Sequence, residues 1–268
     1  MSETQVLSIV DGFSILTCLA FLTYSSWSDV KTREVPDRVW LIFFPIALSL
    51  TSVRIVLCQK LFQVSILSVF LGLIISAILL YSGFFGGADI KALICVTVSN
   101  PTPPATVRPI VGFLHPFFPI TLFCNSCLIA LSSAAYMALR NLLQMSKGGA
   151  RLFGGFEEES VWRKMLAFIS GYKIDISELK KKKHLFPMEQ VLGRNGKMVR
   201  SFKFFVDVEA DQEKMVKGLE EHVKKGLVPR GVWVSPGLPM LVFFALGYVL
   251  TITLGDITFW LIRSLVQF

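Results

Sequence analysis

The chain has 268 residues, of which 53% are hydrophobic and only 17% are charged, and its mean hydropathy is +0.61. Ordinary soluble domains hold about 45–50% apolar and about 25% charged residues, so the chain is more apolar and less charged than they are. The composition therefore excludes an ordinary soluble enzyme or binding module and predicts a membrane protein.

Runs of about 20 apolar residues with few charges mark the predicted membrane-spanning helices. Such runs lie at about 7–28, 39–57, 61–83, 116–140 and 238–262, and a shorter apolar stretch lies near 89–100. We interpret them as about six transmembrane helices. The first run begins with acidic residues, Glu3 and Asp11, and no small-residue cleavage site ends it, so we expect a retained span and not a removable signal peptide.

The basic residues of the short connections predict the orientation of the helices, because lysine and arginine favour the cytoplasmic side. With six crossings, one side carries Lys31, Arg33, Arg38, Lys91 and Arg140. The other side carries Arg54, Lys60, Arg108 and Arg263. We therefore expect the first set in the cytoplasm and both termini outside the cell.

A hydrophilic insert at about 141–235 separates the first five spans, within residues 1–140, from the last span, within residues 236–268. The insert holds 18 lysines and arginines against 12 aspartates and glutamates, which gives it a net charge of +6 out of the formal +8 of the chain. Its lysine run at 180–183 is typical of a solvated surface or of one that contacts anionic lipid head groups. No recognised motif or aromatic platform accompanies this charge, so we expect a cytoplasmic domain without a nucleic-acid partner.

The insert carries the sequence signals of a small α+β domain. Asn195 and Gly196 predict a two-residue hairpin turn, and residues 201–209 alternate between apolar and polar with one exception, as a half-buried strand does. Apolar residues at helical spacing predict a helix over 211–226, and 231–235 reads as a final strand. A further helix, expected to lie on the membrane surface, is predicted around 161–171.

Cysteines and histidines give no sign of a metal site. All five cysteines lie in or beside apolar runs, where a cysteine is usually a small buried hydrophobe. Cys124 and Cys127 form one CxxC without a second pair, which falls short of a zinc site, and the three histidines are scattered. We expect no metal and no cofactor.

Four carboxylates lie near membrane depth, where an ionisable side chain costs several kcal/mol and usually faces protein or water for a functional reason. Asp11 and Asp256 fall toward the external ends of their spans. Asp29 and Asp89 fall at the cytoplasmic end of the first span and at the start of the fourth, so they share a depth and a side. They are the candidate pair for chemistry.

Two aspartates that approach closely suit peptide hydrolysis. Because like charges repel, the pair holds one proton, so one partner can act as base toward a water while the other polarises the scissile carbonyl. Gly86, Gly87 and Ala88 directly precede Asp89, and glycines permit the close backbone approach and unusual dihedral angles that an extended substrate needs. Three prolines at 101, 103 and 104 predict irregular backbone after the fourth span.

At these residues the sequence resembles the type IV prepilin peptidases and their archaeal preflagellin peptidase branch, which are GxGD-type intramembrane aspartyl proteases. Gly86, Gly87, Ala88 and Asp89 resemble the GxGD motif, with Ala88 where the motif has its second glycine. The segment SSWSDVKTREVPDRVW, which contains Asp29, is similar to the segment at the family's first catalytic aspartate. The insert before the last span resembles the archaeal branch, and the absence of a cysteine-rich domain removes any case for N-methylation.

The resemblance implies that Asp29 and Asp89 are the catalytic dyad and that Gly86, Gly87 and Ala88 support it through the backbone. The implied substrate is a membrane-inserted precursor with a short basic leader before a hydrophobic helix, cut at the cytoplasmic membrane face. Asp37 fits either a helix N-cap or a substrate contact. The acidic cluster Glu157, Glu158 and Glu159 fits either attraction of the basic leader or an ordinary solvated patch.

Two other classes of function stay open on the residues alone. An ion- or proton-coupled transporter could use the same aspartates, but it predicts repeat symmetry between the halves of the chain, and we find none. A membrane-anchored interaction protein would use the insert as its binding module and leave both aspartates dispensable. The sequence does not specify an oligomeric state.

Overall fold

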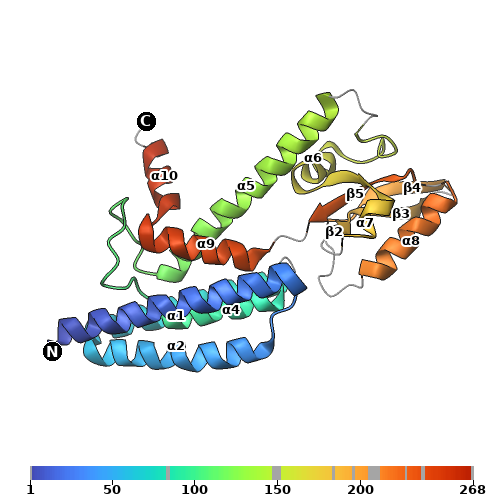
Figure 1. Ribbon diagram of the computed structural model, residues 1–268. Helices are drawn as coiled ribbons and strands as arrows, with labels where there is room; N and C mark the ends of the chain where they lie inside the picture. The colour runs from blue at the N-terminus through green and yellow to red at the C-terminus, as the bar shows by residue number, and fades with distance from the viewer. Residues whose placement is uncertain are drawn as a thin grey trace. The chain divides into compact units, whose positions relative to one another are not determined.

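The computed structural model describes residues 2–82, 85–146, 152–182, 185–194, 197–204, 212–226, 228–236 and 239–266 (Figure 1). The chain forms two compact units: Met1–Ala130 together with Pro239–Phe268, and Leu131–Leu238. The first unit is helical, and the second combines helices with short strands. The predicted fold class, a polytopic helical membrane protein with a small α+β region before the last helix, is confirmed.

Four helices in the described ranges are long and apolar enough to cross a membrane: α1 (Glu3–Thr32), α2 (Asp37–Leu57), α3 (Phe62–Ser82) with the short η1 (Gln59–Leu61) before it, and α5 (Phe118–Ser146). A fifth span results if α9 (Met240–Thr253) and α10 (Ile257–Val266) are counted together. The remaining predicted crossing, the fourth in chain order, corresponds to α4 (Gly87–Ser99), which has 13 residues. At 1.5 Å per residue this helix measures about 20 Å, less than the roughly 30 Å of a hydrocarbon core.

The short helix α4 is the centre of the first unit. It contacts α1, α2, α3 and α9, and Figure 1 shows it lying along α1 and α2. Residues 95–99 are all buried, as expected for a helix that is apolar on every side. Phe43, Phe118 and Tyr248 from the surrounding helices belong to the same core. The first unit is therefore built around the helix that carries Asp89.

The last predicted span is bent by 66° between α9 and α10, which the sequence pattern did not predict. Gly255 has a φ of +105°, and a Cβ there would lie 2.7 Å from the Phe113 carbonyl oxygen, so the bend requires glycine. Asp256 then starts α10, because its Oδ1 accepts the Phe259 backbone N–H at 2.8 Å. Thr121 donates to the other carboxylate oxygen at 2.9 Å, so Asp256 serves the structure of the bend.

The segment between α4 and α5 is irregular, as its prolines predict. Arg54 donates to the carbonyls of Thr102 and Pro103, at 2.9 and 2.5 Å, and Ser68 donates to the carbonyl of Pro101. Side chains of neighbouring helices thus satisfy backbone groups that a helix would have paired. Irregular backbone near membrane depth is tolerated only under this condition.

The second unit contains two antiparallel sheets in the described residues. One has the order β1 (Tyr172–Asp175), β5 (Gly231–Pro236), β2 (Leu185–Pro187). The other is a hairpin of β3 (Glu189–Arg194) and β4 (Lys197–Phe202). The helices are α6 (Val161–Ser170), α7 (Ile176–Leu179) and α8 (Gln212–Lys224).

Most predicted elements of the insert are confirmed. Arg194 pairs with Lys197 across the hairpin, so two residues connect the strands, although Asn195 and Gly196 themselves lie outside the described residues. The helix predicted over 211–226 is α8, which buries Val216 and Leu219, and the final strand is β5. The strand predicted over 201–209 is displaced: β4 ends at Phe202, and 205–211 lie outside the described residues.

Candidate active site

Asp29 lies in the last turn of α1. The helix ends when Arg33 adopts the left-handed conformation, with a φ of 61°, and donates its backbone N–H to the Asp29 carbonyl at 2.9 Å. The Asp29 side chain is half-buried, and no described residue forms a hydrogen bond or an ion pair with its carboxylate. Arg33 is close enough to act on it electrostatically. Asp29 is thus an acid held at a helix end without a bonded partner in the described part of the chain.

Asp89 is the third residue of α4, next to the N-terminus of the helix. Its Oδ2 accepts the backbone N–H of Gly86, the N-cap residue, at 3.0 Å. A carboxylate is favourable here because the first N–H groups of a helix are unpaired and the helix dipole is positive at this end. The side chain is half-buried, and Asp29 lies close enough to act on it electrostatically. The contact between α1 and α4 thus brings the two predicted acids to the same end of the unit.

The motif glycines do not have the unusual backbone angles expected from the sequence. Gly86 has φ −71° and ψ 158°, which is ordinary extended backbone, and Gly87 is the first residue of α4. A Cβ at Gly87 would meet nothing within 4 Å, so the packing of the unit does not require glycine at this position. Ala88 packs against the core of the unit, which explains why a small apolar residue suits this position.

Asp37 does not cap α2, so the N-cap interpretation is wrong. Pro36 occupies the N-cap position without a side-chain hydrogen bond, and Asp37 is the first residue of the helix. Its carboxylate forms an ion pair with Lys91 at 2.6 Å, two residues after Asp89 on α4. Both side chains are exposed, so this pair links the starts of α2 and α4 at the surface of the first unit.

An apolar groove with a volume of about 470 Å³ runs between α2 and α4. Trp40, Phe44 and Ile94 line it, and the Asp37–Lys91 ion pair lies at its border. The groove therefore presents an apolar surface along the helix that carries Asp89.

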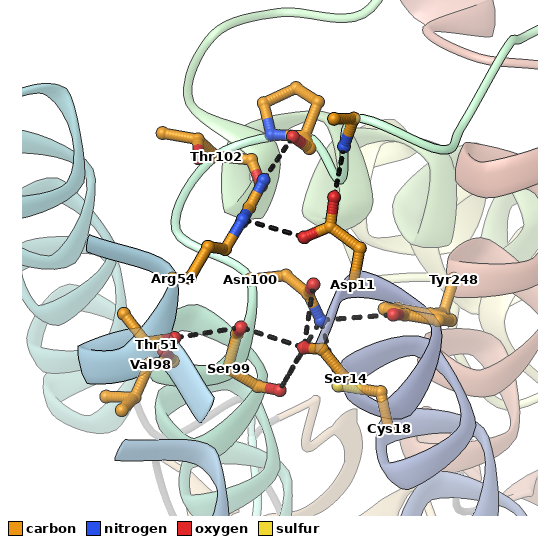
Figure 2. Close-up of polar contacts among 12 residues, drawn as sticks. Asp11, Ser14, Cys18, Thr51, Arg54, Val98, Ser99, Asn100, Thr102 and Tyr248 are labelled. Carbon is orange, nitrogen blue, oxygen red and sulfur yellow. Dashed lines mark hydrogen bonds and ion pairs between the residues drawn. The ribbon is translucent and has the colours of Figure 1, made fainter. Parts of the chain in front are cut away.

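The opposite end of α4 holds a polar network that the sequence analysis did not identify (Figure 2). Arg54 and Asp11 form an ion pair at 2.8 Å, with 3% and 0% of each residue exposed. The other oxygen of Asp11 accepts the Ala105 backbone N–H at 2.6 Å. An arginine inside an apolar span was the available signal, because such a residue requires an acidic partner at its own depth.

Asn100, at the C-terminal end of α4, joins three helices in this network. Its Nδ2 donates to Cys18 Sγ and to the Tyr248 hydroxyl, both at 3.1 Å, and its Oδ1 accepts from Ser14 at 3.0 Å. Thr51 of α2 donates to the Val98 carbonyl at 2.6 Å. Side chains from α1, α2 and α9 thus fix this end of α4.

The acidic cluster Glu157, Glu158 and Glu159 is only partly available to attract a basic leader. Glu159 forms an ion pair with Arg163 at 2.6 Å and accepts the Phe202 backbone N–H at 2.9 Å, and Glu157 accepts the Gly155 N–H at 3.0 Å. Two of the three carboxylates therefore stabilise their own domain.

Two half-buried acids at one end of apolar helices, without a paired lysine or arginine among the described residues, are compatible with a membrane-embedded aspartic peptidase. Comparison with known proteins gives the same class. The sequence model of the "Type IV leader peptidase family" matches residues 16–134, which include both acids, and the model "Archaeal Peptidase A24 C-terminus Type II" matches residues 163–257. The chain belongs to the type IV leader peptidase family, in its archaeal branch, and is a peptidase.

Relatives from three archaeal species align with most of the chain. The preflagellin peptidases of Methanococcus voltae and Methanococcus maripaludis are 26% and 24% identical over 243 and 242 residues, covering 88% of this chain and 92% of each relative. The preflagellin peptidase of Methanocaldococcus jannaschii is 25% identical over 248 residues, covering 88% of this chain and 91% of the relative. The predicted resemblance to this branch is confirmed.

Proposed function

We propose that the chain is an intramembrane aspartic endopeptidase that removes the short basic leader from preflagellin- and prepilin-like precursors. The observation that carries the proposal is the placement of two half-buried acids, Asp29 and Asp89, on two contacting helices. Neither carboxylate forms an ion pair with a described lysine or arginine. Both acids thus remain available for proton transfer.

The proposed chemistry uses one water and one shared proton. One aspartate, ionised, takes a proton from water as the oxygen attacks the scissile carbonyl carbon, and the other, protonated, donates a hydrogen bond to the carbonyl oxygen. The tetrahedral intermediate then collapses when the amide nitrogen leaves with a proton from the pair. The backbone N–H of Gly86 holds one oxygen of Asp89, which directs the remaining oxygen toward the reacting groups.

The apolar groove beside α4 supports a membrane-inserted substrate. A precursor helix could lie along Trp40, Phe44 and Ile94, which would bring the residues before that helix to the level of Asp89. The open space above Gly87 leaves room for the extended backbone that hydrolysis requires. In this arrangement the cut falls just before the hydrophobic helix.

The proposal includes an orientation and a division of the chain. Residues 1–140 carry the dyad, residues 141–235 form a cytoplasmic domain, and residues 236–268 form the last crossing. Asp29 and Asp89 face the cytoplasm and both termini lie outside, because the basic connections favour that sidedness. The transporter and interaction-module alternatives are not favoured, because both matching family models describe peptidases.

The test is cleavage of a purified precursor with a basic leader and a hydrophobic helix by the full chain in detergent, with the product mass read by mass spectrometry. Asp29→Asn and Asp89→Asn should each lower the rate roughly 10²–10⁴-fold or more, since general acid–base catalysis is lost. Glu34→Gln is the matched control, because Glu34 is an exposed carboxylate five residues beyond Asp29, just after the end of α1. This variant should cut like the wild type.

Two results would contradict the proposal. If the wild type leaves the precursor intact, the peptidase assignment to this substrate fails. If both asparagine variants cut at the wild-type rate, the dyad is wrong even though the activity is right. A product cut within the hydrophobic helix, and not before it, would overturn the placement of the substrate.

A further inference from the structure

Helix α6 has two apolar faces, of which only one packs into the second unit. Ala167 is fully buried, and Phe168 packs against the cluster that contains Phe202 and Trp233. The other face consists of large apolar side chains that are all exposed: Val161, Trp162, Met165, Leu166 and Ile169. These residues occupy positions i, i+1, i+4, i+5 and i+8 of the helix, which lie on one side, so they form one continuous stripe, which we call the α6 apolar face.

The α6 apolar face exposes more contiguous apolar surface than a helix in water normally does. Trp162 is 74% exposed and Val161 is 70% exposed. A solvated helix normally places charged residues on this side, whereas here Arg163 is drawn inward by Glu159 and by the Phe202 carbonyl. Contiguous exposed apolar residues of this kind mark a surface that another phase or molecule covers.

The charge pattern of α5 indicates the depth of α6. From Phe118 to Leu139, helix α5 has 22 residues without a charge, about 33 Å of helix, which matches a hydrocarbon core of about 30 Å. Arg140 and Asn141 follow directly, so they mark the level at which α5 leaves the apolar core. The Asn141 amide donates to the carbonyls of Phe168 and Gly171, both at 2.7 Å, at the C-terminal end of α6. The end of α6 is therefore bound to α5 directly after its charge-free stretch.

We infer that α6 is an interfacial helix that inserts its apolar face into the bilayer surface and so anchors the second unit to the membrane. Its 10 residues, about 15 Å, are too few to cross. Tryptophan favours the head-group level, and amphipathic helices lie there with the apolar side roughly 5–10 Å below the head groups. The net charge of +6 on residues 141–235 adds attraction to anionic lipids. This function is separate from the peptidase chemistry and does not depend on it.

The test is photo-cross-linking of the full chain reconstituted in vesicles of phosphatidylcholine and phosphatidylglycerol. The photoreactive residue p-benzoylphenylalanine replaces Met165 on the α6 apolar face. The matched control carries it at Lys217, an exposed position on α8 in the same unit. Mass spectrometry of the peptides should find a lipid adduct at position 165 and none at position 217.

Each other outcome overturns the inference, and a protein cross-link also identifies what covers the surface. A cross-link to residues 1–130 or 239–266 means that the first unit covers the α6 apolar face. A cross-linked dimer means that a second copy covers it. An unreacted peptide, or lipid adducts at both positions, means that the face is solvated or that the adducts are unspecific.

A second measurement needs no photoreactive residue. Bromine atoms on lipid acyl chains quench nearby tryptophans, and the difference between wild type and Trp162→Phe isolates the signal of Trp162. We expect quenching of this component, stronger with bromines close to the head group than with bromines at the chain end. Equal quenching of wild type and variant would place Trp162 outside the bilayer and overturn the inference.

Discussion

The two ends of α4 place carboxylates in opposite environments. At the N-terminal end, Asp89 is half-buried and its carboxylate has one hydrogen bond in the described structure, from the Gly86 N–H. At the C-terminal end, Asp11 lies beside α4 fully buried, paired with Arg54 and bonded to the Ala105 N–H. A buried charge requires a partner to offset its desolvation, whereas a reactive acid must keep an oxygen free. The comparison therefore separates acids that stabilise the helix bundle from acids that are available for chemistry.

Replacing Asp89 should produce the largest effect on activity and little on stability. Asp89→Asn removes the ionisable group, so the cleavage rate should fall roughly 10²–10⁴-fold. The asparagine oxygen can still accept the Gly86 N–H, so the free energy of unfolding should change by less than about 1 kcal/mol. Cleavage rate and thermal unfolding measured on the same sample check both parts. A large loss of stability would show that Asp89 is a structural acid like Asp11.

Replacing Asp11 should have the opposite result, a large loss of stability with little effect on activity. Asp11→Asn leaves Arg54 charged, buried and without its acid, and breaking a buried pair in this way costs about 3–5 kcal/mol. The midpoint of thermal unfolding in detergent should fall, while the cleavage rate per folded molecule stays near the wild-type value.

The double variant Asp11→Asn/Arg54→Met is the control for the Asp11 prediction. It removes both charges, so it should recover part of the stability that Asp11→Asn loses. An unchanged midpoint in Asp11→Asn would mean that the ion pair does not stabilise this end. A double variant less stable than the single one would point to the bonds from Arg54 to Thr102 and Pro103 as the larger contribution.

Tyr248→Phe should have a smaller effect at the same end. The change removes the hydroxyl that accepts from Asn100 Nδ2 at 3.1 Å, and losing one such bond costs about 1 kcal/mol. Tyr81→Phe is the control, because Tyr81 is 92% exposed and should leave the unfolding midpoint unchanged. Equal midpoints for the two variants would show that Asn100 does not depend on Tyr248.

Asp37→Asn should have the smallest effect. Its ion pair with Lys91 lies at the N-terminal end of α4, but the side chains are 74% and 47% exposed. Exposed pairs contribute about 0–1 kcal/mol and are screened by salt, so the unfolding midpoints of wild type and variant should converge as the ionic strength rises. A loss of several kcal/mol would mean that this end of α4 also relies on ion pairing.

Local sequence was sufficient to predict the candidate acids. Asp89 follows a glycine-rich segment at the start of an apolar run and Asp29 ends another, so each could be found within a dozen residues of chain. The Asp11–Arg54 pair could not be found in this way, because its members lie in different helices and Arg54 was interpreted as a charge of an external connection. The prediction that Asp37 is an N-cap failed for a similar reason, since its partner Lys91 belongs to another helix.

The sequence by itself determined the class of this protein, its long apolar helices, the hairpin and the helix of its insert, because hydrophobic patterns and turn residues act over short stretches of chain. Only the tertiary structure decided which charges are buried, where the last span bends and which face of α6 is left uncovered. Burial and pairing depend on which helices become neighbours, and that depends on packing across the whole chain. For this reason the sequence was sufficient to identify Asp89, whereas the pairing of Asp11 with Arg54 was found only in the structure.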